Sequence, residues 1–204
     1  MNVIKHIKQT VSKTPTKPNE SSQSYTPKEL LTPNKDNTGV SKTIFMHVSN
    51  FHRLLCDWIK LIDKGTKICK SIALLNLHDS NDDYYPHRVE NLTDSLLDSL
   101  YSMRDILDSV KILDSQLKAL AKLQPEGTPV IFTWSAAQIS ENISKMYALM
   151  QKEYKLKEVI TENIAHCQDE CLMEVFASGW EFDIYFRVYV SDYLFVETGL
   201  PSVF

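Results

Sequence analysis

The sequence predicts an all-α protein: a long antiparallel helical hairpin or bundle of coiled-coil type, with shorter C-terminal helices and a disordered N-terminal arm. Two segments repeat apolar residues every three or four positions over about five heptads each, which is typical of helices that pack along a seam. Glycine, which weakens helices, occurs only five times in 204 residues. Before residue 44 apolar residues are too sparse for such a seam.

Residues 1–43 form the predicted arm. They contain nine apolar residues, four of the eight prolines, and seven lysines against three acidic residues, which gives a net charge of +4. Such a segment buries too little apolar surface to offset the chain entropy lost on folding. Residues 44–204 are almost half apolar and carry a net charge of −8. We therefore expect a basic, disordered arm followed by one helical interaction domain, 44–204.

The first helix of this domain is expected to begin near Ile44, with Ser41 or Thr43 as its cap, and to end near Leu77. A polar run over 79–86 supplies the turn that follows. Gly65 interrupts the seam without ending the helix. The seam consists of Ile44, Val48, Phe51, Leu55, Trp58 and Ile62, with Leu54, Leu61, Ile68 and Leu75 beside it.

The second helix is expected to end before Pro125 and Gly127. Asp114 stands where the seam would place an apolar residue, so it either sets the packing register or points outward. The seam consists of Leu92, Leu96, Leu100, Met103, Leu107, Val110, Leu117 and Leu120. The residues expected in the core of the two helices are Leu55, Trp58, Ile62, Leu100, Met103 and Leu107.

The remaining helices are shorter. A third helix is expected from Ser135 to around His166, and since only this helix can cover both seams, the bundle is expected to extend into a partner chain. Asp169 should cap a short helix that runs to about Ser178 and stops at Gly179. The final segment, 182–196, has the composition of a strand, but a lone strand would lack a pairing partner, so a helix is preferred.

Motifs and composition argue against several classes of protein. Neither of the two common glycine-rich phosphate-binding motifs occurs, and no apolar run approaches the roughly 18 residues of a membrane span. Residues 1–13 carry lysines but no apolar signal region, which leaves a short amphipathic targeting segment as an alternative. The four scattered cysteines are typical of reduced thiols in the cytosol or nucleus. We expect neither an enzyme nor a membrane or secreted protein, and no cofactor.

Two groups of residues invite a chemical interpretation. His166, Cys167 and Cys171 have the residue types of a zinc site, but a fourth ligand and a C-x-x-C pair are missing, so thiols buried near a helix junction are the favoured interpretation. His52 and Cys56 stand four residues apart on the first helix. A catalytic cysteine would also need an orienting group, and no such group is identifiable, so helical spacing suffices to explain the pair.

The arm contains candidate phosphorylation sites. Thr14 and Thr32 each begin an S/T-P-x-K motif, the pattern of proline-directed, cyclin-dependent kinases, and Thr26-Pro27 is a minimal site. Each phosphate would add about −1.5 to −2 charges, so two would cancel most of the charge on the arm. The arm could therefore act as a phospho-switch. The same lysines could instead bind nucleic acid, and an inert solubilising tail is equally open.

Several residues of the domain occur in a characteristic order. They are Pro129, Thr133-Trp134, Lys152-Glu153, Leu156-Lys157, Ala165-His166, Asp169, Trp180 and Glu197-Thr198-Gly199, preceded by Trp58-Ile59-Lys60-Leu61, Ile68 and Ser71 to Leu75. In this order the chain resembles the cyclin-dependent kinase 2-interacting protein family over most of 44–200, and most densely over 129–180. Residues 1–43 show no match.

The resemblance implies a non-catalytic helical adaptor of the nucleus, with the cytoplasm also open. It implies as partners a cyclin-dependent kinase, the origin-firing kinase of DNA replication and checkpoint proteins. It further implies a place in a chromatin-linked AAA-type ATPase complex that also acts in large ribosomal subunit maturation. A nucleic-acid-associated factor that binds through its arm is the alternative. Trp134, Trp180 and His166 are candidate interface or junction residues, and the two tryptophans either close helix junctions or anchor a partner.

Overall fold

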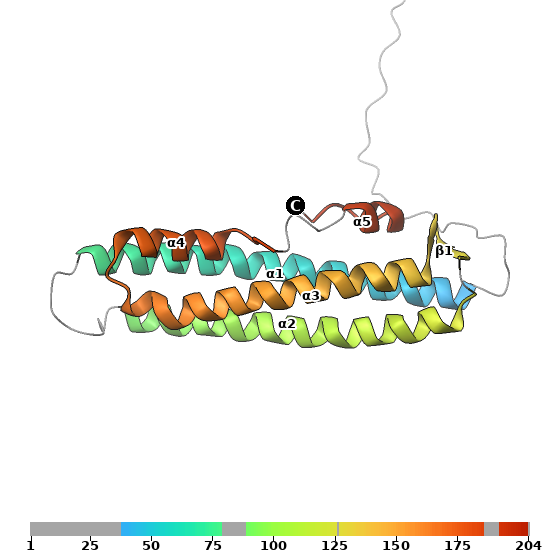
Figure 1. The fold of residues 1–204 in the computed structure, drawn as a ribbon, viewed down its shortest axis with the longest axis horizontal. Coiled ribbons are helices and arrows are strands. Elements are labelled where there is room, and N and C mark those ends of the chain that lie inside the picture. Colours follow the sequence, from blue (N-terminus) through green and yellow to red (C-terminus); the bar gives the residue numbers. More distant parts are fainter. Residues whose placement is uncertain (1–37, 79–88, 126, 186–191, 204) are drawn as a thin grey trace, which may run out of the picture.

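A computed structural model of the chain describes residues 38–78, 89–125, 127–185 and 192–203 (Figure 1). Its body consists of three long helices, α1 (Thr38–His78), α2 (Glu90–Leu123) and α3 (Ala136–Asn163), of which α2 runs antiparallel to the other two. A short hairpin of β1 (Pro129–Ile131) and β2 (Trp134–Ser135) joins α2 to α3. The 3₁₀ turn η2 (Ile164–His166), α4 (Glu170–Glu181) and α5 (Asp192–Thr198) complete the described elements. The prediction of an all-α bundle is confirmed.

The long helices close their seams within this chain. Helix α2 packs against both α1 and α3, while α1 and α3 seldom approach each other directly. Helix α4 packs against both of them, and α5 lies against α1 on the side of the bundle opposite α2 (Figure 1). Helices α4 and α5 thus supply cover that was not predicted, while the expected extension of the bundle into a partner chain stays a prediction. The core prediction is confirmed, since all six expected residues are buried: Leu55, Trp58, Ile62, Leu100, Met103 and Leu107.

Helix α1 begins at Thr38, six residues before the expected start, so the last residues of the predicted arm are helical. The added turn has something to bury, because Val40 packs against the core. Thr43 is not a cap, since its hydroxyl donates to the carbonyl of Gly39 at 2.8 Å, as threonines inside helices do. Residues 1–37 lie outside the described residues.

Helix α2 ends at Leu123, before Pro125 as predicted. Asp114 is buried and points toward α3, so of the two alternatives it sets the packing register and does not point outward. Its carboxylate accepts a hydrogen bond from the Ser144 hydroxyl and pairs with Lys118, whose Nζ lies 2.5 Å away. A polar contact at a single level of an apolar seam favours one register, because a slip of α2 against α3 would break the hydrogen bond with Ser144.

Helix α3 begins as predicted. Ser135 accepts a hydrogen bond from the backbone N–H of Gln138, and the Gln138 side chain accepts one from the backbone N–H of Ser135, which is a capping box. The hairpin before it was not predicted. Its strands pair Pro129 with Ser135 and Ile131 with Trp134, and they are too short to show an alternating apolar pattern.

Asp169 caps α4 as predicted and accepts a hydrogen bond from Leu172 N at 2.9 Å. Gly179 was wrongly expected to end this helix, which continues to Glu181. A Cβ on Gly179 would lie 3.1 Å from Ile160 Cδ1, so the glycine permits a close approach to α3 rather than a turn. Beyond α4, residues 182–185 are not helical and 186–191 lie outside the described residues. The helix preferred for 182–196 is confirmed only from Asp192 onward.

Candidate interaction site

Trp180 fixes α4 to α1. Met173, Ala177 and Trp180 follow the spacing of one helix face, and all three are buried. Beneath the indole lies Gly65 of α1, and a Cβ at that position would be 1.9 Å from Trp180 Nε1. The indole therefore rests directly on the α1 backbone, which only glycine exposes in this way.

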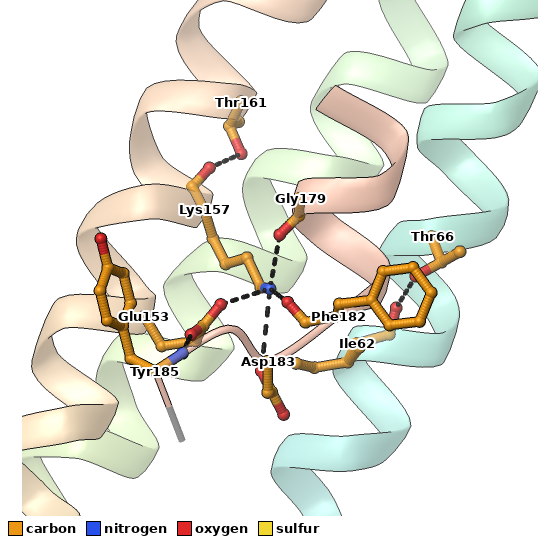
Figure 2. Close-up of polar contacts among 9 residues, drawn as sticks. All are labelled: Ile62, Thr66, Glu153, Lys157, Thr161, Gly179, Phe182, Asp183 and Tyr185. Atoms are coloured by element: carbon orange, nitrogen blue, oxygen red, sulfur yellow. Dashed lines mark hydrogen bonds and ion pairs between the residues drawn. The ribbon is translucent and has the colours of Figure 1, made fainter. Parts of the chain in front are cut away.

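A buried lysine joins α3 to the end of α4 (Figure 2). Lys157 is fully buried, and its ammonium group donates to Glu153 Oε1 at 2.8 Å, to the carbonyl of Gly179 at 2.9 Å and to that of Phe182 at 3.2 Å. Asp183 Oδ1 lies 3.7 Å from the same nitrogen. An ammonium group has three N–H donors, so all three are satisfied without water. The two carbonyls belong to the last turn of α4 and its C-cap, so the lysine holds that end in place.

This buried site contains one cation and two carboxyl groups. Glu153 is the direct partner of Lys157, and its second oxygen accepts a hydrogen bond from Tyr185 N at 2.9 Å. Burial raises the pKa of Asp183 to about 6; Lys157 lowers this pKa, and the charge of Glu153 raises it further. The indole of Trp58 also faces this carboxyl group and lowers its pKa. Because the ammonium group of Lys157 finds all its hydrogen-bond acceptors within this chain, the site is a structural clamp.

At the other end of the bundle, α5 is tied to the hairpin by Glu197. Its Oε1 accepts hydrogen bonds from the backbone N–H groups of Thr133 and Trp134, the latter at 2.8 Å. Gly199 then ends α5 with a φ of 69° and donates to Val196 O at 3.1 Å. Leu200 N donates to Phe195 O at 2.7 Å, which completes a Schellman motif. Residues 133–134 and 197–199, both part of the family resemblance, thus meet at one place.

An apolar surface lies beside this tie. Phe132 is 66% exposed, and on α5 Tyr193 and Val196 are 76% and 72% exposed. Phe132 precedes Thr133 and Val196 precedes Glu197, so the Glu197 hydrogen bonds hold the hairpin loop next to α5. Tyr193 shares the face of Val196 one turn earlier. We call Phe132, Tyr193 and Val196 the hairpin–α5 surface. It lies toward the end of the bundle where α1 begins (Figure 1).

Phe132 is held in a conformation that its side chain disfavours. It is the first residue of the two-residue loop between β1 and β2, and its φ is 38°. Such loops require a positive φ at this position and normally carry asparagine, aspartate or glycine there. An aromatic residue in this region is strained, and strain of this kind concentrates at functional sites. The loop therefore presents a large apolar side chain where a small polar one would be more stable.

The structure separates the three candidate interface or junction residues. Trp180 is fully buried in the last turn of α4, rather than just after it, and touches α1. Trp134 is half-buried in the hairpin and its backbone is held by Glu197. His166 is exposed at the end of η2. Thr14, Thr26 and Thr32 lie outside the described residues.

The cysteine–histidine groups are not assembled for chemistry. Cys167 is buried but Cys171 is exposed, so the expectation of two buried thiols holds for the first only. Within the described residues, no three His, Cys, Asp or Glu side chains gather as metal ligands. His52 stands 3.8 Å from Cys56 Sγ, while its Nε2 bonds to the carbonyl of Pro201 at 2.9 Å and its ring meets Phe195 edge-on. His52 therefore connects α1 to the segment around α5.

Several of these residues were not singled out as site residues from the sequence. Glu153 and Lys157 stood in the family resemblance without being given a role, and their burial depends on α4 covering them. Phe132 carried no signal, because its role depends on a hairpin that was not predicted. Glu197 stood in the family resemblance, and that was the available clue. Among the described residues, none of the helices has the length and apolarity of a membrane span.

The fold and its junctions define a helical-bundle protein whose buried polar groups hold its helices together. The chain is 24% identical over 178 residues to a protein of Bos taurus, the cyclin-dependent kinase 2-interacting protein, and it shows the same identity over the same length to the Homo sapiens protein of that name. Each match covers 74% of this chain and 84% of the relative. No family model matches the chain. The resemblance found in the sequence is confirmed by these two relatives.

Proposed function

We propose that this chain is a non-catalytic adaptor that binds a cyclin-dependent kinase. The observation that carries the proposal is the similarity to two proteins named for their interaction with cyclin-dependent kinase 2, which extends over 74% of this chain. The finer part of the proposal places the chain in the nucleus. There it links the cyclin-dependent kinase and the origin-firing kinase in DNA replication, contributes to checkpoint signalling, and is a subunit of an AAA-type ATPase complex that also acts in large ribosomal subunit maturation.

The hairpin–α5 surface is the proposed kinase-binding site. Aromatic residues are enriched among the residues that dominate binding energies, and this surface offers two of them. Phe132 supports the choice because its strained backbone is hard to explain by packing within the chain. The surface is also held firmly by the hydrogen bonds of Glu197, so little conformational entropy is lost when a partner binds.

Phe132→Asn separates binding from folding. Asparagine tolerates a positive φ better than phenylalanine does, so the variant should fold with an unchanged or higher melting temperature. Loss of the exposed ring should weaken binding of the purified cyclin-dependent kinase–cyclin complex by about tenfold or more, measured by calorimetry. Val196→Asp should act in the same direction. Val159→Asp is the matched control, because Val159 is also an exposed helical valine but lies on α3.

Unchanged kinase affinity in both Phe132→Asn and Val196→Asp would remove the hairpin–α5 surface from the proposal. No binding of the kinase by the unmodified chain would overturn the adaptor function itself. Affinity purification from its own cells, followed by mass spectrometry, tests the finer partners for wild type and Phe132→Asn. The origin-firing kinase, checkpoint proteins and ATPase subunits should be present with wild type. Those that bind through the hairpin–α5 surface should be depleted with the variant.

The alternative function is that of a nucleic-acid-associated factor. The observation in its favour is the net charge of +4 on residues 1–43. Phosphate contacts made by lysines weaken steeply as salt rises, whereas apolar helix packing does not. Binding of a DNA duplex that falls sharply between low and physiological salt, and that is lost when Lys5, Lys8 and Lys13 are replaced by Gln, would favour this alternative.

A further inference from the structure

The N-terminal half of α2 carries an unusual outer face. Leu97 and Tyr101, one turn apart, are 37% and 52% exposed, although the opposite face of the helix is buried in the bundle. In Figure 1, α2 lies on the side of the bundle away from α4 and α5. The apolar pair is surrounded by acidic side chains, and residues 90–108 contain one basic residue, Arg104, against five acidic ones: Glu90, Asp94, Asp98, Asp105 and Asp108.

A segment of this chain has the complementary pattern. Residues 1–13 contain Val3, Ile4, Ile7 and Val11, which fall within an arc of about 100° on a helical projection. The same thirteen residues contain three lysines and no acidic residue, and Lys5 and Lys8 lie on the polar side of that projection.

We propose that residues 1–13 dock as an amphipathic helix on the N-terminal half of α2. The apolar arc covers Leu97 and Tyr101, and the long lysine side chains reach around the segment toward the surrounding aspartates. A thirteen-residue helix is marginal alone in water, so its formation depends on an apolar face to cover. The acidic surroundings add attraction that salt screens, and they select a basic segment over an acidic one.

The connection between the two is long enough. Residues 14–37 supply 24 residues between the segment and the start of α1. Such a linker has a typical end-to-end distance of about 27 Å if it behaves as a flexible coil. Helix α1 begins at the end of the bundle where α2 ends (Figure 1), and Tyr101 lies about 33 Å along α2 from Leu123. A linker whose typical length is close to the span gives a high effective concentration.

The C-terminal half of α2 is a poorer site for the same segment. Residues 109–123 expose Ile112 and Leu123. Their one acidic residue, Asp114, is buried and paired, and their basic residues are Lys111, Lys118 and Lys122. Lysines of the segment would meet lysines there, so the charge pattern of α2 selects its N-terminal half.

Docking on α2 would also give the arm a regulatory role. Thr14 follows directly after the segment, and a phosphate there would bring about −1.5 to −2 charges next to the acidic face of α2. Phosphorylation should therefore weaken docking and uncover Leu97 and Tyr101. This inference does not depend on kinase binding at the hairpin–α5 surface, which lies on other elements.

Backbone amide exchange of the full chain, followed by NMR, tests the proposal. Amides of residues 4–11 should exchange about tenfold or more slowly than expected for a free peptide. Ile4→Asp combined with Ile7→Asp should abolish this protection and shift the resonances of residues 94–105. Leu30→Asp combined with Leu31→Asp is the matched control, since it makes the same kind of change in the arm outside the segment, and it should leave protection intact.

A charge exchange identifies the docking site. Lys5→Glu with Lys8→Glu should abolish the protection, and adding Asp98→Lys with Asp105→Lys should restore it. Absence of protection in the unmodified chain would overturn the proposal, as would protection that the exchanged charges on α2 fail to restore. Protection that depends on protein concentration would assign the segment to a second copy. Protection found only with anionic lipid vesicles or with DNA would assign it to that partner; each of these results overturns docking on α2.

Discussion

Replacing Gly65 by alanine tests whether Trp180 closes the junction between α1 and α4. Glycine inside an exposed helix is less favourable than alanine by about 1 kcal/mol, so the substitution would normally stabilise α1. At this position the new methyl group would stand 1.9 Å from Nε1 and 2.1 Å from Cε2 of Trp180, whereas ordinary contacts begin near 3.4 Å. The indole must therefore move away from α1 by about 1.5 Å, far more than a close-packed interior accommodates.

The size of the effect follows from how far the indole moves. If Trp180 stays inside the bundle and the helices shift around it, overpacking costs about 1–3 kcal/mol. If the indole leaves its site, the loss approaches the 3–5 kcal/mol typical of removing a buried aromatic side chain. After subtraction of about 1 kcal/mol for helix propensity, Gly65→Ala should lower the free energy of unfolding by about 0–2 kcal/mol in the first case and about 2–4 kcal/mol in the second. A loss of 2 kcal/mol corresponds to a melting temperature lower by about 4–8 °C.

Urea unfolding monitored by circular dichroism measures this change, and α1 itself provides the control. A Cβ on Gly39 would meet nothing within 4 Å, so Gly39→Ala should be neutral or slightly stabilising. In the background of Trp180→Leu, a smaller side chain leaves room for the methyl group, so Gly65→Ala should cost much less there. If Gly65→Ala stabilised the protein as much as Gly39→Ala, or cost the same with and without Trp180, the proposed contact between α1 and α4 would be refuted.

Three further predictions concern the buried polar groups. Lys157→Met should lower the free energy of unfolding, measured by urea unfolding, by about 3–5 kcal/mol, because Glu153 and two carbonyls lose their partner. Adding Glu153→Gln should recover part of this loss. The pKa of Asp183 is raised from 3.8 to about 6 in the folded state, so the folded protein holds this proton more tightly than the unfolded chain does. The free energy of unfolding should therefore fall by about 3 kcal/mol as the pH rises from about 4 to 7. Asp183→Asn should weaken this dependence of stability on pH, measured by thermal melts. Glu197→Ala removes the acceptor of two backbone N–H groups, so α5 should become sensitive to limited proteolysis while the melting temperature of the long helices changes little.

The long helices could be predicted because their signal is local and repeated. Each heptad of α1 and α2 contributes two seam residues, so the helical period remains visible even where one heptad is assigned wrongly. Ser135 and Asp169 were recognisable as caps for a similar reason, since a cap bonds to a backbone N–H three residues ahead in the sequence. The first turn of α1 was missed because its composition resembles that of the arm. Val40 stabilises this turn only by packing on the core.

The junctions could not be predicted, because they depend on contacts between distant segments. Gly179 has the residue type of a helix stop, and only its closeness to Ile160 shows that it serves packing. Lys157 has the residue type of a solvated surface, and only α4 makes it a buried cation. The same holds for Gly65, whose lack of a side chain matters because Trp180, more than a hundred residues later, rests upon it.

The positions of the family-like residues bear on where partners bind. Glu153 pairs with the buried Lys157, Trp58 faces the neighbouring Asp183, and Trp180 rests on Gly65. Thr133-Trp134 and Glu197-Thr198-Gly199 meet at the hairpin. Each forms a contact within this chain, so the residues that carry the resemblance are also residues that hold the helices together. Buried groups of this kind cannot touch a partner unless the bundle opens. For the proposed kinase contact we therefore look to exposed side chains beside these junctions, and Phe132, strained and held next to one of them, is the first to test.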